Sequence, residues 1–165
     1  MAIEVLITGG TFDKEYDERT GDLYFNGTHL HEILKSGKTD LHLKIRTIMM
    51  IDSKDMNDTS RAIILEYCHK CRGNKIVITH GTDTMVETAQ YLAKAIKNKT
   101  IVLTGAMKPY KFNSSDGIFN IGTALSFVQT LPPGVYIAMH GKYFNWDNVR
   151  KNRAIGRFET LRKDR

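Results

Sequence analysis

The sequence predicts an α/β fold in which a doubly wound, mostly parallel sheet carries helices on both faces. Three short apolar runs rich in β-branched residues, at 3–8, 75–79 and 100–103, each lead into threonine and glycine. Such runs are typical of buried strands. Segments with helical character separate them along the chain, and strands that alternate with helices favour a parallel sheet.

The remaining elements follow in alternating order. After the first strand we expect a hairpin or mobile loop at 12–25, because Thr20-Gly21-Asp22 favours a turn. The further expected elements are a helix at 30–35, a strand at 43–51, a helix at 57–71, the strand at 75–79, a helix at 84–96, the strand at 100–103, a helix at 119–130 and a strand at 135–139. The segment after Trp146 is polar and basic.

Capping residues mark where several of these helices begin. Thr28 is expected to cap the first helix, and Asn57 or Asp58 opens the second. Thr84 and Glu87 have the spacing of a capping box at the start of the third.

Length and composition indicate one soluble globular domain, residues 1–165. Apolar residues make up 41% and charged residues 25% of the chain, which is ordinary for that class. No apolar run approaches the roughly 20 residues that span a bilayer. The chain begins directly in a strand, with no basic region before an apolar stretch, so we expect no signal peptide and a cytoplasmic location.

The net charge of +6 could attract an anionic small molecule or a polyanion. Basic residues are concentrated near the C-terminus, and a solvated terminal face is the simplest interpretation. We do not expect nucleic-acid binding, because no zinc finger, aromatic RNA-binding signature or basic repeat accompanies the charge. The basic residues are Arg150, Lys151, Arg153, Arg157, Arg162, Lys163 and Arg165.

Two short motifs resemble known sites but lack the rest of the pattern. Cys68 and Cys71 form a Cys-x-x-Cys pair without a second pair, late in an expected helix, so they are interpreted as ordinary thiols. Gly37-Lys38-Thr39 resembles the end of a phosphate-binding loop, but Glu32 stands where that loop needs glycine. Neither motif predicts a metal or nucleotide site.

The loops after the first and third strands carry the candidate chemistry, because ligands bind beyond the carboxyl ends of strands in open α/β sheets. Thr11 is either a turn residue or a nucleophile near Tyr16. Thr82 and Asp83 lie between a strand and a helix, where anions are favoured. A threonine hydroxyl is a poor nucleophile until a base takes its proton. Asp83 alone is a weak base near pKa 4, and a lysine serves only if its pKa falls.

Five motifs in chain order resemble the L-asparaginase family, which includes bacterial asparaginases and the asparaginase-like subunit of archaeal tRNA-dependent amidotransferase. They are residues 8–11, 52–58, 79–89, 104–109 and 115–120. The resemblance implies a Rossmann- or flavodoxin-like N-terminal domain. It also implies hydrolysis of asparagine to aspartate and ammonia through a threonine nucleophile and a covalent acyl-enzyme.

The resemblance also implies roles for single residues. The matching catalytic positions are Thr11 as primary nucleophile, Tyr16 or Tyr24 as its activating tyrosine, Thr82 and Asp83 as the second threonine and its aspartate, and Lys151 as the lysine that completes their relay. Tyr16 is preferred because it is nearer Thr11 in the chain. The matching substrate-binding positions are Gly10, Asp52, Ser53, Gly81 and Ala106. Ser53 would bind the substrate carboxylate, Asp83 its α-amino group, and backbone N–H groups near Thr82 the oxyanion. No metal or organic cofactor is implied.

Two departures from the family pattern affect these expectations. Family members usually carry a second, C-terminal domain that supplies residues to a neighbouring subunit, and this chain stops where the first domain ends, so we expect the short single-domain form. Lys54 stands where classical members place glutamine. A homodimer or homotetramer is expected to replace the missing pocket wall. The alternatives are glutamine hydrolysis, an amidase that feeds ammonia to a tRNA-dependent partner, and a catalytically silent domain that binds a small molecule or RNA.

Overall fold

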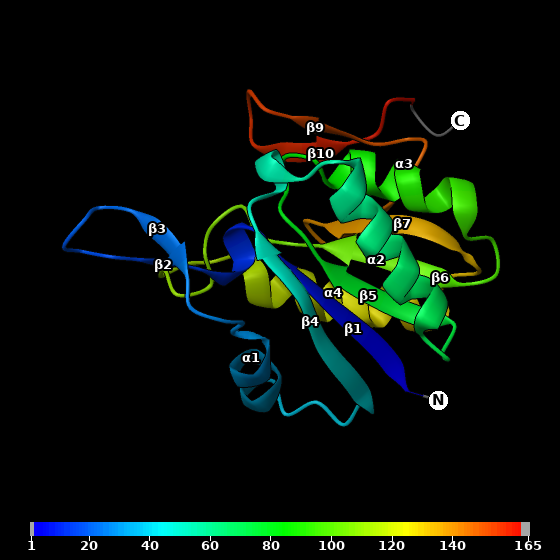
Figure 1. The fold of residues 1–165 in the computed structure, drawn as a ribbon, viewed down its shortest axis with the longest axis horizontal. Coiled ribbons are helices and arrows are strands. Elements are labelled where there is room, and N and C mark those ends of the chain that lie inside the picture. Colours follow the sequence, from blue (N-terminus) through cyan, green and yellow to red (C-terminus); the bar gives the residue numbers. More distant parts are fainter. Residues whose placement is uncertain (1, 163–165) are drawn as a thin grey trace.

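The computed structural model describes residues 2–162, whose centre is a six-stranded sheet (Figure 1). The sheet order is β4 (Leu43–Ile51), β1 (Ile3–Gly9), β5 (Lys75–Thr79), β6 (Thr100–Thr104), β7 (Gly134–Met139) and β8 (Lys142–Asn145). The first five strands pair in parallel, and β8 is antiparallel to β7. The predicted doubly wound, mostly parallel α/β fold is therefore confirmed.

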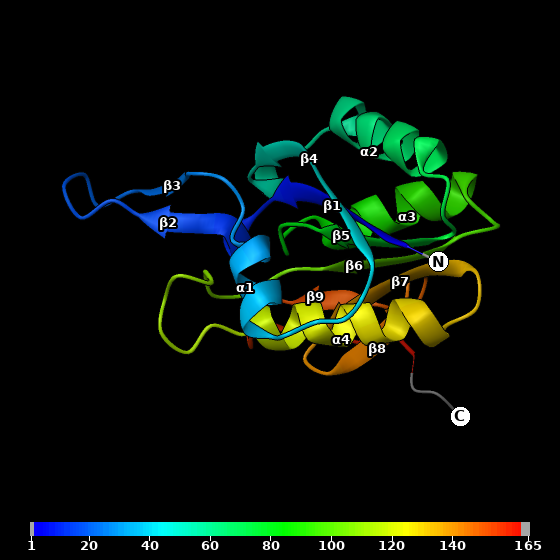
Figure 2. The same ribbon diagram turned by 90° about the horizontal axis from the view of Figure 1, so that it is seen from below.

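Helices cover both faces of the sheet (Figure 2). One face holds α1 (Leu30–Ser36) and α4 (Gly117–Thr130), and the other holds α2 (Asp58–Lys70) and α3 (Met85–Ala95). Alternate residues of β1 enter the two cores: Leu6 packs with α2 and α3, whereas Val5 packs with α1 and α4. Because both faces are buried, these strands are apolar throughout rather than alternating.

The strand order creates a switch point between β1 and β5. The chain leaves β1 for β4 on one side and then returns to β5 on the other side of β1. Ligands bind at such a point in open α/β sheets, because the two connections diverge there and leave a crevice. Thr11, in the short 3₁₀ helix at Thr11–Asp13, and Thr82 follow these two strands.

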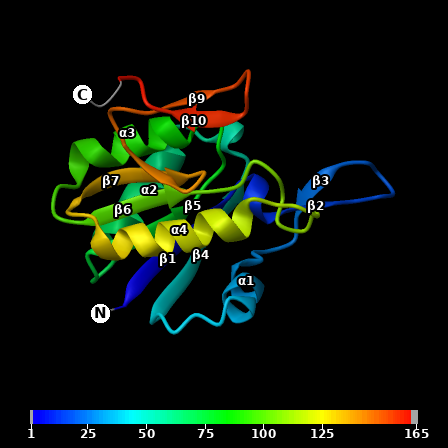
Figure 3. The same cartoon turned by 180° about the vertical axis from the view of Figure 1, so that it is seen from behind.

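Residues 14–25 form the predicted hairpin, with strands β2 (Lys14–Tyr16) and β3 (Leu23–Phe25). The hairpin extends away from the body of the molecule (Figure 1). Three strands near the C-terminus were not predicted: β8, and the hairpin of β9 (Arg150–Asn152) and β10 (Arg157–Glu159), which lies beside α3 in Figure 3.

Two of the predicted helix caps are wrong in detail. His29, not Thr28, is the N-cap of α1, although the Thr28 hydroxyl accepts a hydrogen bond from the Leu30 N–H at 3.2 Å. Thr84 precedes α3 but makes no capping hydrogen bond, because its hydroxyl donates to the Ser53 carbonyl at 2.7 Å instead. A tertiary contact has thus replaced the local capping box.

The predicted cap of α2 and the cysteine interpretation agree with the structure. Asn57 caps α2 by accepting a hydrogen bond from the Ser60 N–H at 3.0 Å. Cys68 and Cys71 are buried, free thiols, and burial raises the pKa of Cys68 to about 12, so its thiol stays protonated. No helix within residues 2–162 is long and apolar enough to cross a membrane.

Candidate functional site

Two glycines allow three loops to meet at the switch point. Gly10 has φ +82°, and a Cβ atom there would lie 2.4 Å from the Gly81 backbone. A Cβ atom on Gly81 would in turn lie 2.6 Å from the Ser53 Cβ and Oγ. The Gly10 N–H donates to the Ile51 carbonyl at 3.0 Å. Only hydrogen fits between these loops, so the glycines bring the ends of β1, β4 and β5 into direct contact.

Lys151 joins Thr82 and Asp83 across a large separation in sequence. Its Nζ donates to the Thr82 Oγ1 and to the Asp83 Oδ1, at 2.8 Å in each case. Thr82 is buried in the loop that follows β5, and Lys151 is on β9. Phe158, opposite Lys151 in the hairpin, is buried in the core and anchors the hairpin so that Lys151 reaches Thr82. The structure thus brings together three of the predicted catalytic residues.

Asp83 is surrounded by cations. Besides Lys151, Arg153 Nη1 donates to Asp83 Oδ1 at 2.8 Å, and the Lys54 Nζ lies 3.6 Å from Oδ2. Although partial burial would raise the pKa of Asp83, the hydrogen bond and charge of Lys151, with the charges of Lys54 and Arg153, hold it below its usual value. Sequence reasoning gave Arg153 no role, although its position two residues after Lys151 was a usable signal.

Asp52 shapes the turn that presents Ser53. Its Oδ1 accepts the Lys54 N–H at 3.0 Å, and its Oδ2 pairs with the Lys14 ammonium. Burial would raise the pKa of Asp52, but the hydrogen bonds from Lys14 and the Lys54 N–H lower it on balance. Ser53 is buried against Gly81. Sequence reasoning also gave Lys14 no role, because its partner, Asp52, follows a different strand of the sheet.

Thr11 and the two candidate tyrosines are not joined in the structure. Thr11 is half-buried, and within residues 2–162 its hydroxyl has no hydrogen-bond partner. Tyr16 is 55% exposed and packs edge-to-face on Phe112, with ring centroids 6.5 Å apart. Tyr24 is 42% exposed and donates to Glu15 Oε2 at 3.2 Å. The choice of Tyr16 as the activating tyrosine stays a prediction.

Ala106 lies in the loop after β6 and is almost inaccessible to solvent. Two residues fix this loop: the Asp116 carboxylate accepts the Met107 N–H at 3.0 Å, and the Asn120 side-chain amide donates to the Gly105 carbonyl at 2.9 Å. Ala106 can therefore offer a ligand only its backbone or a small apolar surface.

A network of buried hydrogen bonds contacts the Gly81 carbonyl. His80 Nδ1 lies 2.7 Å from the Gly81 carbonyl, which can only accept, so Nδ1 carries the proton. Nε2 then accepts from the Thr88 hydroxyl at 2.8 Å, and that hydroxyl accepts from Arg61 Nε at 3.3 Å. Complete burial lowers the pKa of His80 to about 4, so the ring is neutral. This network, which sequence reasoning missed, holds the peptide before Thr82 in place.

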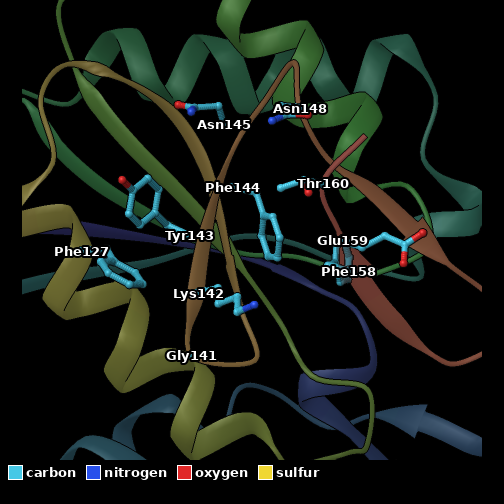
Figure 4. A pocket seen from close by; sticks show the side chains of 10 residues that line it. All are labelled: Phe127, Gly141, Lys142, Tyr143, Phe144, Asn145, Asn148, Phe158, Glu159 and Thr160. Atoms are coloured by element: carbon cyan, nitrogen blue, oxygen red, sulfur yellow. The ribbon is translucent and has the colours of Figure 1, made fainter. Parts of the chain in front are cut away.

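A hollow of about 580 Å³ lies elsewhere, between β8 and the β9–β10 hairpin (Figure 4). Phe127, Tyr143, Phe144 and Phe158 line it, and its carboxylate, Glu159, is already paired with Arg150 at 2.7 Å. None of the predicted site residues lines it. Within residues 2–162, no group of three histidine, cysteine, aspartate or glutamate side chains could hold a metal ion.

Comparisons with known proteins identify the family to which this chain belongs. The family described as Asparaginase, N-terminal, matches residues 2–162. L-asparaginase 2 of Escherichia coli (strain K12) is 38% identical over 132 residues, which cover 74% of this chain and 37% of that protein. A glutamyl-tRNA(Gln) amidotransferase component from Methanococcus vannielii is 34% identical over 148 residues, covering 85% of this chain and 34% of that protein.

A solved structure extends the likeness to the fold. The thermostable L-asparaginase from Thermococcus kodakarensis superposes with a TM-score of 0.87 at 29% identity, covering 99% of this chain and 52% of that one. The chain spans about half the length of that protein and less of the two relatives above. The chain belongs to the asparaginase family and corresponds to the N-terminal domain of its members.

Proposed function

We propose that this chain hydrolyses L-asparagine to L-aspartate and ammonia through a threonine nucleophile and a covalent acyl-enzyme. The observation that carries the proposal is the bridge from Lys151 to both Thr82 and Asp83, at 2.8 Å each, beside the switch point of the sheet. A hydroxyl paired with an amine that a carboxylate holds in place can take a proton from an attacking water once the amine is neutral, and this is the role proposed for Thr82, Lys151 and Asp83.

In the proposed reaction, Thr11 Oγ1 attacks the amide carbon and the C–N bond breaks, so that ammonia leaves with the proton taken from the hydroxyl. Tyr16 would accept and return that proton after the hairpin moves toward Thr11. Water then attacks the acyl carbon. The Thr82–Lys151 pair, once its amine is neutral, takes one proton from the water and passes it to Thr11 Oγ1 as the C–O bond to Thr11 breaks, which restores Thr11. Backbone N–H groups near Thr82 would hold the oxyanion.

The substrate would lie over the surface formed by the 52–54 turn and the 81–83 loop, which pack directly against each other. Ser53 lies against Gly81 there, and Lys54 supplies positive charge beside it. These groups support binding of the substrate carboxylate. We further propose that the chain assembles as a homodimer or homotetramer, in which a second copy supplies a wall of the pocket and leaves the Lys54 and Arg153 side chains open to the ligand. Gel filtration that finds a fully active monomer contradicts the assembly. The cytoplasmic location stays a prediction.

Ammonia release tests the function. The assay compares asparagine, glutamine and a blank without amide, using wild type, Thr11→Ala, Thr82→Val and the control Thr130→Val, whose exposed hydroxyl is on α4. We expect release by wild type and the control, and loss in both site variants. Clean wild-type protein that releases no ammonia from either amide would favour the silent binding domain.

Glutamine hydrolysis is the second candidate. The likeness to an amidotransferase component favours it as a role in which ammonia passes to a partner. Glutamine is one methylene longer, a difference that a pocket discriminates by only ~1–3 kcal/mol. The ratio of kcat/KM for the two amides decides between them.

A further inference from the structure

The two carboxylates at the candidate site are both already neutralised by basic side chains. Asp52 pairs with the Lys14 ammonium and also accepts the Lys54 N–H. Asp83 Oδ1 accepts from both Lys151 and Arg153 at 2.8 Å. Within this ion-pair cluster, four basic side chains surround two carboxylates, so the cluster carries excess positive charge.

The four basic side chains of the cluster differ in how exposed they are to solvent. The Lys14 and Lys151 side chains are only 16% and 13% exposed and are used within the fold. Those of Lys54 and Arg153 are 69% and 65% exposed, although both reach Asp83. A ligand that arrives from solvent therefore meets Lys54 and Arg153 before it reaches Asp83.

The positive charges of the cluster favour the binding of some ligands over others. The ammonium of a free amino acid amide needs an available carboxylate, and here it must displace Arg153 or Lys54 from Asp83 or lie among like charges. A ligand with a carboxylate and no ammonium avoids that cost and keeps its attraction to both basic groups.

We propose that Lys54 and Arg153 are specificity residues that favour dicarboxylic acid monoamides without an α-ammonium over the corresponding amino acid amides. The chemical step rests on the proposed function and is the same hydrolysis: the amide C–N bond breaks, water supplies the new acid oxygen, and ammonia leaves. Only the group at the α-carbon of the substrate differs.

The test compares succinamate, which is asparagine without its amino group, with L-asparagine itself. The measured quantity is the ratio of kcat/KM for succinamate to that for asparagine, in wild type, Lys54→Gln, Arg153→Gln and the double variant. Lys94→Gln is the matched control, because it removes one exposed positive charge in the last turn of α3. We expect a ratio above one in wild type and the control. It should fall about threefold in each single variant and about tenfold in the double variant. A wild-type ratio below one, or a fall of less than about threefold in the double variant, overturns the proposal.

A binding measurement separates this proposal from the proposed function. Calorimetry with succinate and L-aspartate gives the ratio of their affinities in the same five proteins without any turnover. If no amide is hydrolysed and the affinity ratio still falls in the double variant, the proposed function fails and the charge selectivity stands. If both amides are hydrolysed and neither ratio moves, the selectivity fails and the proposed function stands.

Discussion

Thr82 lies in a turn that the fold contacts on several sides, whereas Thr11 begins a segment that leads into an exposed hairpin. The Thr82 turn is packed against Ser53, bonded to Lys151 and supported by the His80 network. The hairpin that carries Tyr16 extends from the body; its base is tied to the body by the Lys14–Asp52 ion pair, and Tyr16 contacts Phe112 through its ring. We therefore propose that one half of the site is preformed and that the other half is completed by movement of the hairpin.

The largest expected effect comes from the preformed half. Thr82→Val removes the hydroxyl that Lys151 contacts and keeps the shape of the side chain, so kcat should fall by about 10³-fold. Ammonia release under saturating substrate measures it. Thr130→Val should retain wild-type turnover. A Thr82→Val variant within threefold of wild type would mean that the preformed half has no chemical role.

The second prediction is that the stability of the preformed half depends on a neutral His80 ring. Its folded pKa of about 4 is below the ordinary 6.5, so the stability linked to the neutral ring is fully present above pH 6.5. As pH falls from 6.5 toward 4, about 3 kcal/mol should be lost. Urea unfolding at several pH values measures this loss.

The matched variants for that titration are His80→Gln and, as a control, the exposed His42→Gln. The pH dependence over this range should become shallower only in His80→Gln. Equal slopes in all three proteins would show that His80 titrates normally.

The third effect concerns the hairpin. Tyr16→Phe should lower kcat by about 100-fold, because the phenol would take the Thr11 proton once the hairpin closes. Tyr24→Phe is the matched control on the paired strand, and we expect less than about a threefold change there, since its hydroxyl bonds Glu15 at the surface. The reverse pattern would move the role to Tyr24.

The smallest effect compares two glycines with similar backbone angles. Gly10 and Gly21 have φ +82° and +78°, but only Gly10 is packed against another loop, since nothing lies within 4 Å of a Cβ on Gly21. Gly21→Ala should cost about 1 kcal/mol of unfolding free energy through strain alone. Gly10→Ala should cost about 2 kcal/mol more, because its Cβ collides with Gly81. Equal costs in urea unfolding would contradict the close packing.

The same division explains what could be predicted from the sequence. The buried strands and their threonine-bearing ends were predictable, because burial on both faces makes a continuous apolar run. The β9–β10 hairpin was not, since among residues 147–162 only Val149 and Phe158 are buried. Lys151 was found through the family resemblance. Its partners are 68 and 69 residues away, and no local pattern records such a contact. The role of Lys14 was missed for the same reason.

The central claim is that Thr82 and Lys151 act as one unit. A double-mutant cycle of kcat for Thr82→Val, Lys151→Met and the combined variant tests it most directly, with circular dichroism to confirm that each protein is folded. We predict that each single variant loses about 10³-fold and that the double variant is no slower than either. A double variant that loses the product of the two single effects would contradict the claim, because the two residues would then act independently.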